Sequence, residues 1–256
     1  MIDRVKNGLI THLTTLFGPP FGEVHREPWA LWLSTGDPDP YRNGVLDAIP
    51  GDGGEVDRLL APFRELGLPM MWWFFTGPGG LEGAVHRLLL GRGLTLDSDR
   101  PAMTLDLTRL TPVKVPDGLE VRLVRTEAEF NEWLDVGADA FETADRHTSI
   151  STQSFRRWGF GPESPFRHFI SSFEEIPVGT ATMSWTNDVA SFGNIGTRRA
   201  FRRRGIARAT LGVALAHARD MGLTGATLSA DPDGTLLYRA LGFETVGRHL
   251  TYVWKP

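Results

Sequence analysis

Cysteine is absent from the 256 residues of this chain. Without it the chain cannot form disulfides, use a thiol nucleophile, or bind zinc or an iron–sulfur cluster through thiolates. A reducing cytoplasm is therefore the expected setting. Long apolar runs are also missing, because the most apolar stretch, residues 68–75, is far shorter than the roughly 20 residues that span a bilayer. We expect no transmembrane segment.

The remaining composition is that of an ordinary globular protein, with 41% hydrophobic and 23% charged residues. A formal net charge of −4 gives no general attraction to nucleic acid or to an anionic membrane. Near the N-terminus, apolar residues from Val5 to Phe17 recur at helical spacing, which predicts an amphipathic helix and not a signal peptide.

Two prolines and a glycine in residues 110–118 predict a boundary near the middle of the chain. Both halves are predicted to alternate strands and helices, and 143–165 is a polar, turn-rich stretch. Strands are expected at 29–33, 43–49, 70–75, 102–107, 119–124, 167–173, 177–185, 190–197, 225–230 and 245–254, and helices at 55–66, 81–90, 127–141, 206–221 and 235–241. The ends of the two halves share one order of elements, which we interpret as an internal duplication. The alternative is that no duplication occurred, because any two segments that alternate strands and helices resemble each other to some degree.

The segment with the clearest chemistry lies between the strand at 190–197 and the helix at 206–221. It contains Arg202-x-x-Gly205-x-Ala207 within a run of arginines. A glycine and a small residue at a strand-to-helix turn let the backbone approach an anion, and the N-terminus of the helix directs free N–H groups toward it. Residues 202–208 are therefore a predicted pyrophosphate cradle. The segment has no Lys-Ser/Thr pair, so a P-loop and nucleotide triphosphate chemistry are not indicated.

This motif resembles the signature of the GNAT superfamily of acyl-CoA-dependent N-acetyltransferases. Residues 231–243, in which Tyr238 precedes Leu-Gly-Phe243, are similar to a later motif of that family. The resemblance implies an α/β fold of the tandem GNAT kind, with mixed central sheets flanked by helices. It implies a degenerate GNAT-like lobe at 1–112, which would not acetylate, and a catalytic domain at 117–256.

The resemblance also implies roles for single residues. The backbone of 195–197 would pair with the pantetheine arm of acetyl-CoA, and the amides of 203–207 would bind the pyrophosphate. Tyr238 would protonate the departing thiolate, which suits a phenol with an ordinary pKa of about 10. The cofactor-binding set is Ile195, Gly196, Thr197, Arg202, Arg203, Arg204, Gly205, Ile206, Ala207, Arg208 and Asp231, and the catalytic set is Tyr238 and Asn194.

Two positions depart from the family pattern. Asp231 stands where the family often has asparagine, and the strand 191–197 carries no acid although many members have a glutamate there. A water, or one of Glu142, Asp145, His147 and His168, would then remove the proton from the acceptor amine, and Asn194 would orient a water or the amine. No metal is expected, because no histidine or acidic spacing suggests one.

The expected reaction is direct transfer of acetyl from acetyl-CoA to an acceptor amine, in a cytoplasmic monomer or homodimer. The first alternative is an acyl-CoA-binding sensor that retains the cradle without turnover. A second alternative, a nucleic-acid-binding protein that uses the arginines of 198–208, fits the net negative charge poorly. The acceptor amine is left open: a small amine, an antibiotic, an amino acid and a peptide N-terminus all fit.

Overall fold

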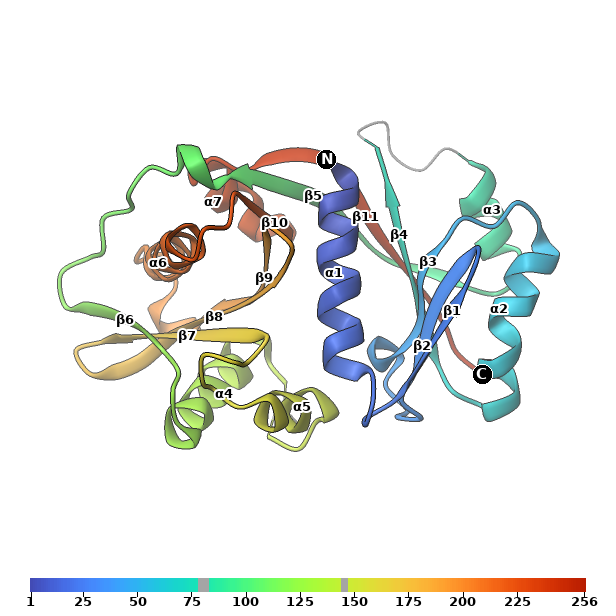
Figure 1. Ribbon diagram of the computed structural model, residues 1–256, viewed down its shortest axis with the longest axis horizontal. Coiled ribbons are helices and arrows are strands. Elements are labelled where there is room, and N and C mark those ends of the chain that lie inside the picture. The colour runs from blue at the N-terminus through green and yellow to red at the C-terminus, as the bar shows by residue number, and fades with distance from the viewer. Residues whose placement is uncertain (78–82, 144–146) are drawn as a thin grey trace. The chain divides into compact units, whose positions relative to one another are not determined.

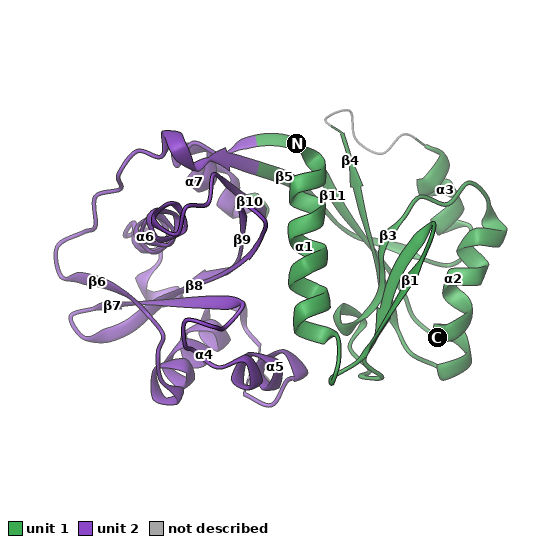
Figure 2. Ribbon diagram, viewed as in Figure 1, with its two compact units in different colours: residues 1–103, 229–232, 245–256 green, residues 104–228, 233–244 purple. Residues whose placement is uncertain are grey.

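A computed structural model describes residues 1–77, 83–143 and 147–256. The chain forms two compact units (Figure 2). Unit 1 contains Met1–Met103, Ser229–Pro232 and Thr245–Pro256, and unit 2 contains Thr104–Leu228 and Asp233–Glu244. The last strand of the chain is thus counted with the first unit. A GNAT-like lobe at 1–112 followed by a catalytic domain at 117–256 stays a prediction.

Unit 1 is a mixed sheet with helices on both faces (Figure 1). Its elements are α1 (Ile2–Phe17), β1 (Glu23–Glu27), β2 (Ala30–Ser34), β3 (Asn43–Ala48), α2 (Gly53–Leu66), β4 (Met70–Thr76), α3 (Ala84–Leu90), β5 (Thr95–Asp106) and β11 (Glu244–Trp254), with the short 3-10 helix η1 (Pro40–Arg42) before β3. The strand order is β1-β2-β3-β4-β11-β5. β3 and β4 are parallel, whereas β4 and β11 are antiparallel.

The core of unit 1 is built from strands in which apolar residues either alternate with polar ones or follow one another without a break. Trp72 and Phe74 of β4 and Leu250 and Tyr252 of β11 share one cluster with the apolar face of α2. On the opposite face, Val5 of α1 packs near Phe75 and Val246. The continuous apolar run of β4 is therefore a strand covered on both faces.

Unit 2 is also a mixed sheet, with strand order β10-β9-β8-β7-β6. Its elements are β6 (Leu119–Leu123), α4 (Glu127–Phe141), α5 (Ile150–Trp158), β7 (Phe166–Phe173), β8 (Ile176–Thr186), β9 (Val189–Thr197), α6 (Ile206–Asp220), β10 (Gly225–Ser229) and α7 (Thr235–Ala240), with 3-10 turns η2 (Leu107–Arg109), η3 (Arg199–Phe201) and η4 (Pro232–Gly234). β9 and β10 are parallel and the other neighbours are antiparallel. In Figure 1, α6 covers one face of the strands β7 to β9, and α4 and α5 cover the other.

Glycines set the closest contacts of these layers. A Cβ atom on Gly179 of β8 would lie 2.8 Å from Ile206 of α6, and one on Gly196 of β9 would lie 2.9 Å from Ala140 of α4. In the connection from residue 110 to 118, Val113 packs against Gly212 of α6, where a Cβ would approach it to 2.7 Å. Residues 110–118, the predicted boundary, therefore include a residue that packs against α6.

The two halves of the chain repeat one succession of elements. In unit 1 the order β1-β2-β3-α2-β4-α3-β5 corresponds to β7-β8-β9-α6-β10-α7-β11 along the rest of the chain, with a parallel pair on either side of α2 and of α6. The predicted α/β fold with mixed sheets flanked by helices is confirmed, and the repeated order agrees with the tandem arrangement.

Some predicted elements differ from the structure. The stretch 143–165 contains the helix α5, which begins where Ser149 caps it by accepting the N–H of Thr152 at 3.2 Å. β1 was not predicted, because its five residues carry no buried side chain. β5 begins at Thr95, before the predicted position 102. The prediction missed its first part because those residues are mostly exposed and lack an apolar pattern. The predicted helix 81–90 falls partly outside the described residues, and within them it begins at Ala84.

Candidate cofactor and catalytic site

The predicted cradle, residues 202–208, joins η3 to α6 and has a backbone that favours glycine. Gly205 has a φ of 77° and is the N-cap of α6, and Arg203 has a φ of 66°. Both lie in the left-handed region, which glycine adopts freely and an arginine adopts only with strain. The sequence supplies glycine at one of the two positions, and it is the one from which the helix begins.

The N-terminus of α6 is not capped by any side chain of the described residues, and its first turn carries no acidic residue. Its first N–H groups have no intrahelical acceptors, and the helix dipole adds a positive partial charge there. Arg203, Arg204 and Arg208 are exposed around this end of the helix. These features suit an anion.

The corresponding helix of unit 1 has the opposite arrangement. Asp52 is the N-cap of α2 and accepts the N–H of Glu55 at 3.0 Å, and the Glu55 carboxylate accepts the N–H of Gly51 at 2.7 Å. A Cβ on Gly53 would collide with the Arg92 guanidinium. The start of α2 is therefore filled by its own carboxylates, which would repel a phosphate.

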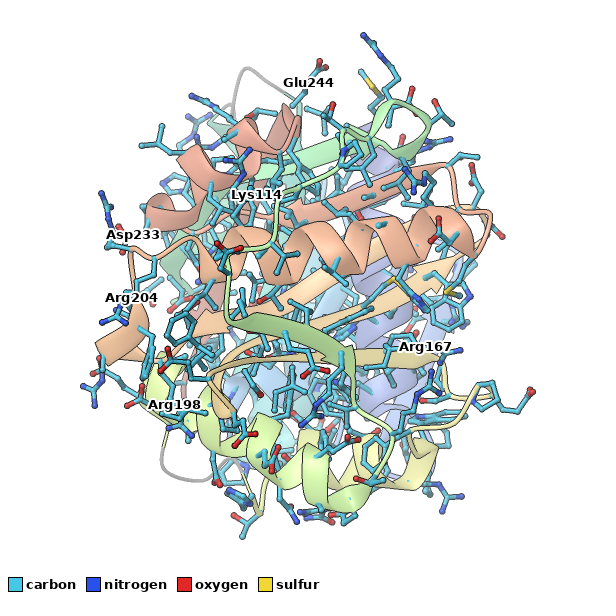
Figure 3. All side chains as sticks on the ribbon, turned by 90° about the vertical axis from the view of Figure 1, so that its left-hand side faces the viewer. Lys114, Arg167, Arg198, Arg204, Asp233 and Glu244 are labelled. Atoms are coloured by element: carbon cyan, nitrogen blue, oxygen red, sulfur yellow. The ribbon has the colours of Figure 1, made fainter. Side chains whose placement is uncertain are left out.

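Not all of the arginines in this segment are free to meet a ligand. Arg202 Nη2 donates to the carbonyl oxygen of Ala140 at 2.9 Å, and Arg198 Nε donates to that of Pro177 at 2.8 Å. Arg204 lies with its guanidinium carbon 5.2 Å from the centre of the Phe201 ring. In Figure 3, Arg198 and Arg204 lie on the same side of the view and Arg167 on the opposite side. Arg202 and Arg198 thus fasten the loop to its neighbours.

Asp139 of α4 binds the start of the same loop. Its Oδ2 accepts the backbone N–H of Arg199 at 2.8 Å. That hydrogen bond is the largest cause holding the pKa of Asp139 below its ordinary value. Together with the charges of Arg199 and Arg198, it outweighs desolvation, which acts in the opposite direction. The charged carboxylate fixes the start of η3.

The strands before and after the cradle part from each other. β9 and β10 pair only through Val189–Ser191 and Gly225–Thr227 within the described chain, although β9 continues to Thr197. The Arg198 N–H donates to Val178 of β8 at 2.8 Å. Backbone groups of an antiparallel strand alternate between its two edges, so the N–H and C=O of Thr197, the preceding residue, point to the edge that β10 has left. An extended chain can pair there.

Asn194 interrupts the pairing of β9 with β8. It has a φ of 50°, and the register shifts between the pairs Thr180↔Gly196 and Thr182↔Gly193, so a β-bulge lies at this point. The Thr180 hydroxyl donates to the Asn194 carbonyl oxygen at 2.8 Å, and Asn194 Nδ2 lies 3.5 Å from the Thr182 hydroxyl. The two threonines were not predicted, although their spacing along a buried strand is the signal that could have identified them.

Three more residues of the predicted cofactor set have these positions. Thr197 Oγ1 is buried without a hydrogen-bond partner in the described residues, on the strand edge beside the cradle. Gly196 is buried against Ala140 and Phe141, so its lack of a side chain serves the packing of α4. Ile206 is the first residue of α6. Its side chain is buried against Val178 of β8, so only its backbone N–H can contribute to the cradle.

Tyr238 lies on α7 and is 8% exposed. Its ring lies across Gly234, where a Cβ would be 2.7 Å from the ring edge and 3.1 Å from the hydroxyl oxygen. The Phe243 ring meets it edge-on, with centroids 6.1 Å apart. The phenol is thus fixed by packing on a short helix.

Asp231 lies in unit 1 and forms an ion pair with Arg100, with a distance of 3.2 Å between Oδ1 and Nε. Both side chains are more than two-fifths exposed. This ion pair was not predicted. Because arginine supplies the donors that the aspartate lacks, the pair gives this position a different chemistry from the asparagine of the family pattern.

The predicted candidates for a base lie in different surroundings. Glu142 is exposed at the end of α4 and faces Arg199 at 3.5 Å, and His147 is paired with Asp135 at 2.7 Å, with both groups well exposed. His168 is 2% exposed, and its Nδ1 lies 3.0 Å from the Thr182 hydroxyl. Asp145 lies outside the described residues. Among the other three, only His168 is linked through hydrogen bonds to Asn194.

Metal sites and membrane-spanning helices are two further features to consider. In residues 1–77, 83–143 and 147–256, no group of three or more His, Asp or Glu side chains is arranged to hold a metal ion. Across the same residues, no helix has the length and apolar character needed to cross a membrane.

Comparison with known proteins adds a family to this geometry. Residues 129–243 match the sequence model of the Acetyltransferase (GNAT) family. A mycothiol acetyltransferase of Catenulispora acidiphila is 27% identical over 219 residues, which cover 80% of this chain and 66% of that protein. The match thus spans just under two thirds of that relative.

Solved structures share the fold. A GCN5-related N-acetyltransferase from Kribbella flavida matches with a TM-score of 0.75 and 19% identity, over 100% of this chain and 96% of that one. A tandem GNAT protein from the clavulanic acid biosynthesis pathway matches with a TM-score of 0.62 and 17% identity, over 98% of this chain and 87% of that one. Residues 129–243 thus match the GNAT acetyltransferase family, and the chain shares the fold of solved GNAT structures, one of which is a tandem GNAT protein.

Proposed function

We propose that this chain transfers the acetyl group of acetyl-CoA to the nitrogen of an acceptor amine. The observation that carries the proposal is the uncapped N-terminus of α6, which stands beside the parted strands β9 and β10. The first feature suits a pyrophosphate, and the second suits an extended amide-containing arm. Acetyl-CoA contains both groups in series.

In this proposal the backbone amides of 203–207 bind the pyrophosphate, and the exposed Arg203, Arg204 and Arg208 add positive charge. Arg202 contributes by fastening the loop to Ala140. The backbone of 195–197 pairs with the pantetheine arm through Ile195 and Thr197, whose N–H and C=O groups point to the open edge of β9, whereas those of Gly196 face β8. The buried Thr197 hydroxyl, which has no partner in the described residues, is a further polar group on this path.

The transfer itself requires a neutral amine, whose lone pair attacks the thioester carbonyl carbon. A new C–N bond forms, the C–S bond breaks, and the nitrogen loses one proton to water. The departing thiolate takes a proton from the Tyr238 hydroxyl, which packing holds on α7, and the phenolate regains a proton from water once CoA has left. Backbone N–H groups on the open edge of β9 stabilise the oxyanion, and no covalent enzyme intermediate forms.

Isothermal calorimetry with acetyl-CoA, without an acceptor and in physiological salt, is the first test. We expect binding at one site per chain with a dissociation constant in the micromolar range or below, because α2 is capped by its own carboxylates and α6 is not. A panel of amino acids, amino sugars, antibiotics with amino groups and short peptides then tests turnover by release of free CoA. Absence of acetyl-CoA binding would overturn the proposal.

A second candidate is an acyl-CoA sensor that binds the thioester without turnover. It is favoured by one observation: Glu142 and His147 both have charged partners, Arg199 and Asp135, on exposed surfaces. Binding of acetyl-CoA together with no amine-dependent release of CoA across the panel would select the sensor.

A further inference from the structure

A chain of three polar side chains crosses the sheet of unit 2 from β9 to β7. Asn194 Nδ2 lies 3.5 Å from Thr182 Oγ1, and Thr182 Oγ1 lies 3.0 Å from His168 Nδ1. Thr182 is directly opposite His168 on one side and Gly193 on the other, so these positions share a face of the sheet. The chain links the bulge of β9 with the interior.

The inner end of this chain lies in an aromatic surrounding. The centre of the His168 ring is 4.5 Å from that of Phe155, 4.9 Å from that of Trp133 and 5.3 Å from that of Phe130. Both His168 and Thr182 are at most 2% exposed. Burying polar groups among aromatic rings is unfavourable unless they are hydrogen-bonded, and an apolar side chain would pack there at least as well. Packing alone therefore does not explain this histidine.

The amide fixes the direction of one of the two hydrogen bonds. An amide nitrogen can only donate, so the Thr182 oxygen accepts from Asn194. A hydroxyl can accept a second hydrogen bond or donate one, so Thr182 pairs with His168 Nδ1 in either tautomer of the imidazole. Because Nδ2 makes the contact with Thr182, the other arm of the planar amide, Oδ1, does not face that hydroxyl. Since Thr180 also holds the Asn194 backbone at 2.8 Å, β8 fixes both the main chain and the side chain of this residue.

We propose that Thr182 and His168 are positioning residues that hold the Asn194 amide with Oδ1 presented as a hydrogen-bond acceptor for the acceptor substrate. The inference rests on the proposed function and specifies it: the group bound at Asn194 is an N–H donor. An amine that donates one N–H to Oδ1 keeps its lone pair for the thioester carbonyl. Gly193, the neighbour of Asn194, leaves space for the approach, because a Cβ there would meet no atom of the described residues within 4 Å.

Matched substitutions test the chain through kinetics. Thr182→Val has nearly the same shape but no hydroxyl, whereas Thr182→Ser keeps the hydroxyl. With the panel amine that the wild type acetylates fastest, we expect Thr182→Val to lower kcat/KM by about three- to tenfold and Thr182→Ser to stay within about twofold. Calorimetry should give the same acetyl-CoA affinity for both. Equal kcat/KM values for the valine and serine variants would overturn the proposal.

A second pair of variants separates a connected chain from two independent packing effects. His168→Phe fills the aromatic surrounding but removes Nδ1, which pairs with Thr182, and should lower kcat/KM about as much as Thr182→Val. The double variant should lose no more than either single one, since both break the same chain. Additive losses would show that the two residues act separately and would contradict the proposal.

A measurement without turnover tests the contact between Thr182 and the Asn194 amide. Nitrogen-15 NMR of the proteins without substrates should show the Asn194 side-chain amide signal displaced in Thr182→Val and close to its wild-type position in Thr182→Ser. An amide signal that is the same in all three proteins would overturn the proposal. Because this readout needs no acceptor, a wild type that acetylates no amine of the panel would contradict the proposed function while the Asn194 signal still decides the fate of the positioning chain.

Discussion

Reversing one charge at the start of α6 should weaken acetyl-CoA binding while making the protein more stable. Arg208 is the third residue of this helix, and the corresponding residue of α2 is Glu55, which accepts the Gly51 N–H at 2.7 Å. Arg208→Glu therefore introduces into α6 the carboxylate that fills the N-terminus of α2. The variant changes the local charge by two units in the direction that repels phosphate.

The size of the effect follows from the charges. Two charge units acting on a pyrophosphate with about two negative charges at about 6 Å in water give about 3 kcal/mol, and physiological salt screens this to about 1.3 kcal/mol. That is about a tenfold rise in the dissociation constant. Competition of the new carboxylate for the same amides adds to the loss. A carboxylate at the helix N-terminus should at the same time raise the unfolding free energy by about 0.3–1 kcal/mol.

Arg219→Glu is the matched control, because it makes the same charge change at the other end of the same helix. Arg208 and Arg219 are eleven positions apart along the helix, a rise of about 16 Å, which is about twice the screening length in physiological salt. Here the helix dipole favours the native arginine, so stability should fall slightly while acetyl-CoA affinity stays within about twofold. Calorimetry and urea unfolding of both variants decide the matter. Equal affinity losses in the two would refute a phosphate site at the N-terminus of α6.

Three further predictions concern other parts of the chain. Tyr238→Phe should lower kcat at least tenfold while leaving the acetyl-CoA dissociation constant within about twofold, measured by CoA release and calorimetry. Gly193→Val should raise KM for the acceptor several-fold with unchanged acetyl-CoA affinity, because it fills the open space beside Asn194. Between pH 7.5 and 5, His249→Gln should lose about 2 kcal/mol less stability than the wild type does. Burial, followed by the nearby Arg100, lowers the pKa of His249 to about 3, so the unfolded chain binds a proton as the pH falls through about 6.5 and the native state does not.

The outcomes that would contradict these predictions are equally specific. An unchanged kcat for the phenylalanine variant would remove the acid role of Tyr238. Unaltered acceptor kinetics in Gly193→Val, with Gly193→Ala as the milder companion, would place the acceptor elsewhere. Parallel pH profiles of stability for the wild type and His249→Gln would show that His249 is not kept neutral by the fold.

Local patterns predicted the elements that depend on local interactions. The glycine of Arg202-x-x-Gly205-x-Ala207 was interpretable because a left-handed backbone at a helix start favours that residue, and Gly205 indeed has a φ of 77°. The strand 70–75 was also predictable, since a run of large apolar residues bounded by turns suits a strand covered on both faces. Motif and period carry this information without knowledge of the partners.

Long-range partners were beyond prediction because they depend on which elements pack together. Arg202 is part of the predicted cradle, yet its guanidinium binds Ala140, 62 positions away. Asp231 meets Arg100, and the hydroxyls of β8 meet the bulge of β9. In each case the residue type was visible and its partner was not, because a sequence period assigns a face to a residue and not a neighbour.

The place of β11 affects how the protein is made. Residues Arg248–Trp254 pair with Met70–Thr76 of β4, so unit 1 acquires this strand of its sheet only when residues 248–254 have left the ribosome. Until then β4 presents an edge of Met, Trp and Phe residues, the kind of exposed strand that recruits other chains. Folding during synthesis therefore cannot proceed strictly from the N-terminus, and a fragment that ends in residues 110–118 would keep this edge permanently and aggregate.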